Sequence, residues 1–261
     1  MSDGLEITGL TAGYSGRAII GGLDLPELRP GTVTSLIGPN AAGKTTLLRA
    51  LAGLHPATGH VRLGGQELLS LPLVEHARAV TYMPQSLPQR VALSVLEAVA
   101  GALRASPVEG PTLSDAALMA RALKVIELVG IGRKALTGLD HLSGGQRQLA
   151  SLAQALARGP RVLLLDEPIS ALDLYYQLRV MKLVRQLAAE RGMIVVMVLH
   201  DLAIAARWSD RVVVLHEGRV MADGAPAQAI SAGVLAEVYR VAGRVEQDGA
   251  DLRVLIDDIL P

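Results

Sequence analysis

The sequence of 261 residues predicts an α/β fold with a mainly parallel sheet, an antiparallel β edge and an inserted α-helical subdomain. Residues 33–50 combine an apolar, strand-like run, a short loop of small residues and a leucine-rich helical segment. Continuous apolar runs at 162–166 and 193–200 suit strands that are buried on both faces of a parallel sheet. From about residue 86 to residue 157, Ala and Leu recur at helical spacing. Because strands alternate with helices, right-handed crossovers between parallel strands are expected.

The first part of the chain is expected to form the antiparallel edge. Residues 5–25 alternate in polarity and contain glycine-rich turns, and residues 61–68 are typical of a hairpin that turns at Gly64 and Gly65. Residues 79–83 are expected to form a further strand. Tyr14 lies in the loop-like segment TAGYSG, where two interpretations stay open: a surface turn residue, or a flat ring on which a nucleobase stacks.

The last third of the chain continues the alternation of helix and strand. A helix is expected over 173–191, followed by the strand that ends at His200, a helical segment, and a strand over 212–215. Residues beyond about Arg244 are acidic and carry no landmark, so the sequence assigns them no role.

The composition indicates a large apolar core and no net charge. Hydrophobic residues make up 50% of the chain, and 25 Lys and Arg balance 25 Asp and Glu. Without a net field to collect polyanions, a dedicated nucleic-acid-binding protein is disfavoured. The chain has no Cys, which excludes disulfides and thiolate metal sites. It has neither a secretory signal nor an apolar run of the roughly 18 residues that span a membrane. We therefore expect a cytosolic protein whose membrane association depends on a partner.

The loop that follows the strand at 33–37 has the composition of a phosphate-binding loop, which is typical of a P-loop NTPase core. Small residues let the backbone approach phosphate oxygens, and the helix N-terminus offers amides without partners. Lys44 would reach the outer phosphates, and the hydroxyl of Thr45 would join the shell of Mg²⁺. The competing interpretation is a turn that only caps the helix. The residues expected to bind the phosphates are Gly38, Pro39, Asn40, Ala41, Ala42, Gly43, Lys44, Thr45 and Thr46.

Three further polar side chains follow buried strands, where open parallel sheets bind their ligands. Asp166 can hold Mg²⁺, and the adjacent Glu167 can orient or deprotonate a water that attacks a phosphate. A solvated acidic strand end is the alternative. His200 ends the next strand and is either a structural histidine or part of the same site.

The segment LSGGQRQ opens a helix and forms a second anion-binding helix start. Ser143 is expected to cap this helix, and Gly144 and Gly145 leave its first amides open to an anion. One chain therefore has a single phosphate loop but two anion-binding helix starts. This suggests that the second one serves a nucleotide held by another copy.

Together these motifs resemble, in order and over nearly the whole chain, the ATP-binding subunit of an ABC transporter. GPNAAGKTT is similar to the Walker A loop, VLLLDEP to the Walker B strand and LSGGQ to the family signature, which ends at Gln146. Gln85 is similar to the Q-loop glutamine, residues 170–173 to the D-loop, and His200 to the switch histidine. Tyr14 falls where the family has its adenine-stacking aromatic residue.

The resemblance implies a head-to-tail dimer that holds two ATP molecules with Mg²⁺, each between the Walker A loop of one subunit and the signature of the other. Glu167, His200, Lys44 and Gln85 would be the catalytic residues. The nucleotide would contact Tyr14, the phosphate loop, residues 143–146 and Asp173, and the metal ligands would be Thr45, Gln85 and Asp166.

It also implies a single ABC ATPase domain over 1–244. The nucleotide-binding core would comprise 1–85 and 159–244, and the helical subdomain 86–158, with 245–261 as a C-terminal extension of unknown role.

Two positions depart from the family pattern. Ala41 stands where Gly is usual, which is harmless only if that position does not require a positive φ. Ile169 replaces the usual small hydroxyl residue and is expected to alter local packing alone.

The second half of the chain resembles the ATPases of importers for iron-siderophores, haem and cobalamin. This implies an ATPase bound peripherally to the cytoplasmic face of the inner membrane, where residues 86–99 lie near integral-membrane permease subunits. A periplasmic or extracellular substrate-binding protein would be an indirect partner, and no nucleic acid is expected. The alternative is a soluble ABC-type ATPase that acts on nucleic acid or ribosomes, but the long coiled-coil insertion or second cassette common in such relatives is missing.

Overall fold

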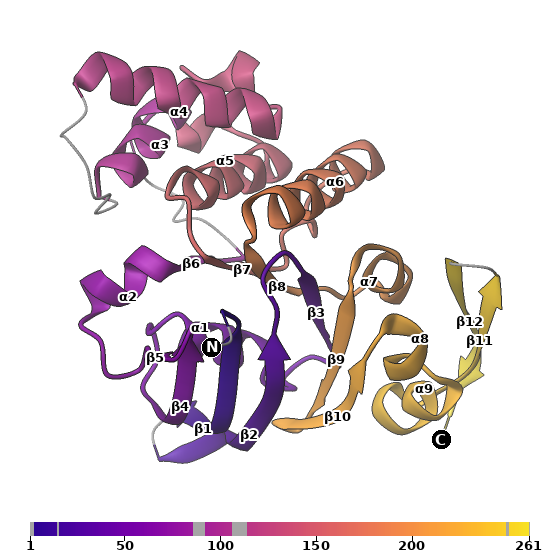
Figure 1. Cartoon of the computed structure of the whole chain (residues 1–261). Coiled ribbons are helices and arrows are strands. Elements are labelled where there is room, and N and C mark those ends of the chain that lie inside the picture. The colour runs from indigo at the N-terminus through magenta and orange to yellow at the C-terminus, as the bar shows by residue number, and fades with distance from the viewer. Residues whose placement is uncertain (1–2, 15, 86–91, 106–113, 249–250, 261) are drawn as a thin grey trace.

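The structure is a computed structural model that describes residues 3–14, 16–85, 92–105, 114–248 and 251–260. Within these residues, the strands form sheets of six, four and two strands. A layer of helices covers one side of the six-stranded sheet, and the four-stranded sheet lies beyond it on the other side (Figure 1). The predicted α/β class with an inserted helical region is confirmed.

The six-stranded sheet forms the centre of the molecule. Its strand order is β10-β9-β3-β8-β7-β6, and all neighbours are parallel except the antiparallel pair β10 and β9. Every residue of β3, β7 and β8 is buried, which accounts for the apolar runs of β7 and β8, and β3 buries Thr34 and Ser35 among its apolar residues. The strands are β3 Val33–Ile37, β6 Val80–Met83, β7 Val162–Asp166, β8 Ile194–Val198, β9 Arg211–His216 and β10 Arg219–Gly224.

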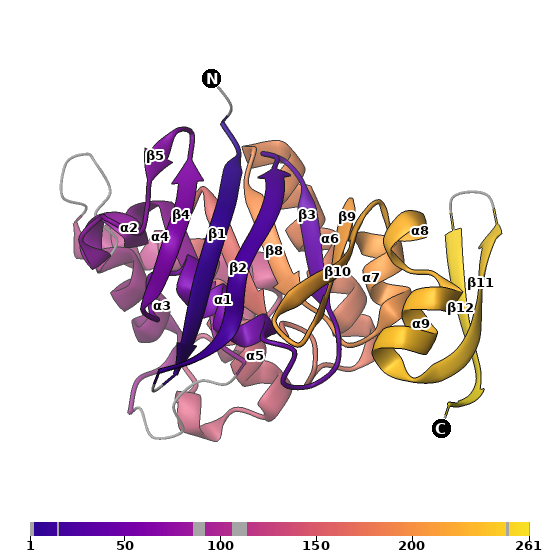
Figure 2. The same ribbon diagram turned by 90° about the horizontal axis from the view of Figure 1, so that it is seen from below.

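The predicted antiparallel edge forms a sheet of its own, with strand order β2-β1-β4-β5. It packs over helix α1, Lys44–Leu51, whose Leu47 and Leu48 share one apolar cluster with residues of both sheets. Figure 2 shows β1, β2 and β4 in front of α1. The strands are β1 Leu5–Tyr14, β2 Arg17–Leu28, β4 Ala57–Leu63 and β5 Gln66–Glu67, and β4 and β5 turn at the predicted glycine pair.

The helical region contains α3 Val95–Arg104, α4 Asp115–Val129 and α5 Gly144–Ala157, which pack against one another. The long helix α6, Leu174–Arg191, lies beside them over the six-stranded sheet (Figure 1). Helix α2, Leu73–Ala79, precedes β6, so the predicted strand at 79–83 is one residue shorter than expected. Residues 86–91 of the expected permease-facing segment lie outside the described residues.

The C-terminal part contains an antiparallel hairpin that sequence analysis did not predict. In the part of the chain that the structure describes, strands β11, Val241–Asp248, and β12, Asp251–Ile259, pair only with each other. They pack on α7 and α9, and Val245, Leu252 and Val254 are partly buried against the main core. Helices α7 Leu202–Trp208, α8 Pro226–Ala229 and α9 Ala232–Tyr239 precede the hairpin. The division of the chain at residue 244 stays a prediction.

Candidate nucleotide-binding site

The loop between β3 and α1 has the shape that a phosphate-binding loop requires. Gly43 caps α1 at φ 102°, and Gly38 adopts φ 143°. A Cβ atom on Gly38 would lie 2.0 Å from the carbonyl oxygen of Leu215, so only glycine fits there. The chain therefore turns sharply from the strand into the helix and leaves the helix N-terminus open.

Lys44 folds back over this loop. Its ammonium donates to the carbonyl oxygens of Gly38 and Pro39, at 2.7 and 2.8 Å. Burial lowers the pKa of Lys44, against the opposite effect of the nearby carboxylates of Glu167 and Asp166. The negative charge of a bound polyphosphate would stabilise the charged form of this desolvated ammonium.

Ala41 adopts φ 62°, in the left-handed region. The alanine would be a harmless replacement for the usual Gly only if this position did not require a positive φ, and the structure shows that it does. For an L-residue this conformation costs roughly 1–2 kcal/mol. The side chain is exposed, so the cost comes from the backbone and not from a clash with neighbours.

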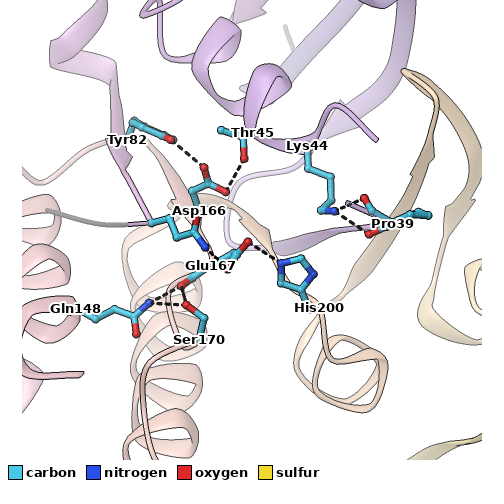
Figure 3. Close-up of polar contacts among 11 residues, drawn as sticks. Pro39, Lys44, Thr45, Tyr82, Gln148, Asp166, Glu167, Ser170 and His200 are labelled. Carbon is cyan, nitrogen blue, oxygen red and sulfur yellow. Dashed lines mark hydrogen bonds and ion pairs between the residues drawn. The ribbon is translucent and has the colours of Figure 1, made fainter. Parts of the chain in front are cut away.

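Asp166, at the end of β7, is buried and held by two hydroxyl groups. Thr45 donates to Oδ1 at 3.2 Å, and the phenol of Tyr82 donates to Oδ2 at 2.9 Å (Figure 3). One carboxylate and one hydroxyl are the oxygen ligands that Mg²⁺ uses when phosphates complete its shell. Among the described residues no cluster of three or more His, Cys, Asp or Glu could hold a metal alone. The donor set therefore fits a magnesium ion that arrives with a polyphosphate.

Tyr82 was missed by sequence analysis, where it reads as an ordinary strand residue. Its oxygen also accepts a hydrogen bond from Nε of Arg49, at 3.4 Å. Burial raises the pKa of Tyr82 to about 12, so the phenol stays protonated and donates to Asp166 across the physiological range.

Glu167 lies where three segments meet. Nε2 of His200 lies 2.6 Å from its Oε1 (Figure 3). Nε2 of Gln85 donates to its Oε2 at 2.7 Å. Glu167 adopts φ 52°, a conformation that non-glycine residues rarely keep. The structure thus brings together Gln85, Glu167 and His200, which are far apart in the sequence. The amide nitrogen of Gln85 points at Glu167, and its proposed place among the metal ligands stays a prediction.

Tyr14 stands at the open end of the phosphate loop and is half exposed. Its ring lies 4.2 Å from that of His55, with 41° between the two planes. Nε2 of His55 lies 2.6 Å from the carbonyl oxygen of Gly13 and donates to it, which fixes the imidazole. A cavity of about 240 Å³ is lined by residues 40–46 together with Tyr14, Glu167 and His200. A nucleotide whose base stacks on Tyr14 would extend its phosphates along this cavity.

The LSGGQ segment lines a different cavity. Ser143 accepts a hydrogen bond from the amide of Gln146 at 3.3 Å, and the side chain of Gln146 accepts from the amide of Ser143 at 3.1 Å. This reciprocal cap confirms the expected helix start. The helix start, with Gly144 and Gly145, lines a hollow of about 940 Å³ that also borders Asp173. Asp173 caps α6 by accepting from the amide of Tyr176 at 3.1 Å. Of the residues expected to bind nucleotide, 143–146 and Asp173 thus lie apart from the phosphate loop.

A comparison with known families decides the assignment. The model of the family described as ABC transporter matches residues 25–170, more than half of the chain. The chain belongs to the ABC transporter family. The matched residues include the loop at 38–46, the end of β7 with Glu167 after it, and the segment 142–146, whose sequences resemble the Walker A loop, the Walker B strand and the signature.

Curated relatives agree with the family assignment over most of the chain. The hemin import ATP-binding protein HmuV of Hahella chejuensis is 39% identical over 228 residues, which is 84% of this chain and 86% of the relative. HmuV of Rhodopseudomonas palustris is 37% identical over 259 residues, 96% of this chain and 93% of the relative. The resemblance to an ABC transporter ATP-binding subunit is confirmed, and of the three predicted importer types, for iron-siderophores, haem and cobalamin, these two relatives represent the haem type.

Solved ABC cassettes share the fold. The dimeric cassette MJ0796 in a post-hydrolysis state bound to ADP and Pi superposes with a TM-score of 0.77 and 27% identity, over 85% of this chain and 98% of that chain. A nucleotide-free cassette from an ABC transporter gives a TM-score of 0.80 over 90% of this chain and 98% of that chain, and at 22% identity it supports the fold alone.

Proposed function

We propose that the chain is the ATP-hydrolysing subunit of an ABC importer that acts on the cytoplasmic face of a cell membrane. The observation that carries this proposal is the arrangement around Glu167. A carboxylate held by His200 and Gln85 stands beside Asp166 and the Walker A lysine, on the edge of the sheet where parallel strands end.

Each side chain has a task in the hydrolysis of ATP. Lys44 and the amides at the start of α1 bind the phosphates, and Tyr14 supports the adenine. Glu167 orients the attacking water and accepts its proton, and His200 holds the carboxylate in place. Thr45 and Asp166 would hold Mg²⁺, which neutralises charge on the phosphates.

The signature needs a second copy of the chain to act on a nucleotide. Because residues 143–146 and the Walker A loop line separate cavities, one subunit cannot close both onto one ATP. A head-to-tail dimer would place the helix start of one copy against the phosphates bound by the other. The dimeric state of the solved cassette MJ0796 supports this arrangement.

The cargo that we propose is an iron chelate or related macrocycle: iron-siderophore, haem or cobalamin, with haem favoured by the hemin import relatives. None of the helices in the part of the chain that the structure describes combines the length and apolarity needed to cross a membrane. Permease subunits would therefore supply the translocation path, and a substrate-binding protein outside the membrane would deliver the cargo.

The test begins with the purified chain. Wild type should hydrolyse ATP only with Mg²⁺. Lys44→Ala should weaken ATP affinity about tenfold to hundredfold, because it removes a charged hydrogen-bond donor. A normal affinity of this variant would contradict the role given to the Walker A loop.

The importer role is tested by affinity co-purification from detergent-solubilised membranes of the host, followed by reconstitution in liposomes. A many-span permease at comparable stoichiometry, and ATPase activity stimulated by a binding protein loaded with hemin, ferric siderophore or cobalamin, would support the proposal. Recovery with ribosomes or DNA, without a permease, would replace it with the soluble ATPase alternative.

A further inference from the structure

The buried amide of Gln148 ties the signature helix to the turn that carries Glu167. Gln148 lies on α5, two residues after the LSGGQ segment, and its side chain is 6% exposed. Its Nε2 donates to the carbonyl oxygen of Glu167 at 2.5 Å and lies 3.3 Å from the hydroxyl oxygen of Ser170 (Figure 3). Its Oε1 accepts from the amide of Ala171 at 3.0 Å. Both amide hydrogens and the amide oxygen are thus in use.

A second contact joins α5 and the turn that carries Glu167. A Cβ atom on Gly145 would lie 2.8 Å from the carbonyl oxygen of Ala171. The first turn of α5 therefore touches the turn at 167–171 directly, and Gln148 bonds it one helical turn later. The Gln148 amide both donates to and accepts from the backbone of this turn. In a buried site without water, no other group can take over these hydrogen bonds, so they fix the position of the turn.

The backbone that Gln148 holds is strained. Glu167 keeps φ 52°, although the left-handed region is unfavourable for a residue with a Cβ atom. Such a conformation persists only where the surroundings fix it. The bond from Gln148 to the carbonyl oxygen of Glu167 is one of these fixing contacts, and it is the one that comes from another helix, since this oxygen also accepts from the amide and the hydroxyl of Ser170, at 3.4 and 3.2 Å.

We propose that Gln148 is a positioning residue that holds Glu167 in its catalytic orientation and so links the signature helix to the general base of the same subunit. The proposal rests on the function given above. In a head-to-tail dimer, the N-terminus of α5 faces the nucleotide of the partner, whereas Glu167 acts on the nucleotide of its own subunit. One amide therefore joins the two ATP sites, so that hydrolysis at one nucleotide depends on how the other is held.

The test compares Gln148→Leu with a matched variant on the same helix. Gln154→Leu makes the same change at a partly buried position, where Nε2 of Gln154 donates to the carbonyl oxygen of Ala150, one turn back in α5, and to no other segment that the structure describes. Thermal unfolding of both variants verifies that they fold. Gln148→Met, which keeps the length of the side chain but has no N–H or O–H to donate to Glu167, is a second variant in case Gln148→Leu does not fold.

We expect Gln148→Leu and Gln148→Met to lower kcat about tenfold to hundredfold, since a small displacement of a reacting group has an effect of this size. KM for ATP should stay within about twofold of wild type, because the Walker A contacts are unchanged. Gln154→Leu should match wild type in both constants.

ATP-driven dimerisation tests whether Gln148 only maintains the structure of the LSGGQ segment. In a Glu167→Gln background, the change Gln148→Leu should leave ATP-driven dimerisation, measured by light scattering, as strong as in the single variant. A weakened dimer would mean that Gln148 acts on the signature end and not on Glu167, and would overturn the proposal, as would an unchanged kcat. If Glu167→Gln alone fails to dimerise with ATP, the proposed function fails first.

Discussion

Nε2 of His200 and Nε2 of Gln85 bond the two opposite oxygens of the Glu167 carboxylate, at 2.6 and 2.7 Å. Both oxygens of this proposed general base are therefore occupied by protein donors. A water that Glu167 deprotonates must share or replace one of these bonds. Binding of nucleotide and closure of the dimer are the events expected to make that exchange.

The pair Glu167 and His200 gives the first prediction. Glu167→Gln should lower phosphate release at saturating ATP by about 10²–10⁴-fold, because the amide cannot accept a proton, and ATP binding should persist. His200→Ala should also lower turnover, because one of the two bonds that orient the carboxylate is lost. His60→Ala, on β4 and paired with Glu67, is the control. Unchanged turnover in Glu167→Gln would remove this carboxylate from its role.

Ala41 gives a prediction on stability. Ala41→Gly should stabilise the nucleotide-free protein by up to about 1 kcal/mol, because relief of the positive φ exceeds the extra chain entropy of glycine when unfolded. Urea denaturation measures the free energy of unfolding. The neighbouring Ala42 is buried and lies outside the residues with positive φ, so Ala42→Gly should instead destabilise the protein. Equal effects at the two positions would argue against strain at Ala41.

His55 gives a prediction on nucleotide affinity. Its ring packs against Tyr14 and its Nε2 is fixed by the carbonyl oxygen of Gly13, so His55→Ala should loosen the adenine platform. We expect ATP and ADP affinity to fall by similar factors, since the base and not the terminal phosphate loses support, while affinity for inorganic triphosphate stays unchanged. Calorimetric titration with the three ligands checks this. A loss confined to ATP would contradict the position given to the base.

Tyr82 gives a prediction on pH. The pKa of Tyr82 is raised to about 12 by burial, so the ultraviolet titration of the folded protein should contain a tyrosinate component near that pH which Tyr82→Phe removes. The folded pKa lies above the unfolded value, so the contribution of Tyr82 to stability is complete below about pH 10 and is lost as the pH rises towards 12. The difference in unfolding free energy between wild type and Tyr82→Phe should therefore shrink over this interval. If this free-energy difference stayed constant with pH, the raised pKa and the burial of the Tyr82 phenol would be contradicted.

The sequence predicted the buried strands well because their composition alone determines them. Strands β7 and β8 are covered on both faces, so each reads as an apolar run with clear ends. The order of the strands in the sheet was not predictable, because hydrophobic periodicity does not show which strands are neighbours. In the structure β3 lies between β8 and β9.

The residues that sequence analysis missed act through contacts between distant segments. Tyr82, His55 and Gln148 have no unusual spacing, and their partners Asp166, Tyr14 and Glu167 come from other parts of the chain. The C-terminal hairpin did leave a signal: an Asp-Gly pair at 248–249 between two segments of alternating polarity.

The position of β3 also governs how the protein can be made. Its hydrogen-bonded neighbours are β8 and β9, which follow more than 150 residues later in the chain. During synthesis the phosphate-binding loop therefore emerges from the ribosome long before the strands that complete its sheet. Until residue 216 is available, β3 lacks at least one of the two strands that pair with its edges, and the nascent chain must be shielded from aggregation. A chain truncated before β8 should accordingly be degraded and not persist as a partly active ATPase.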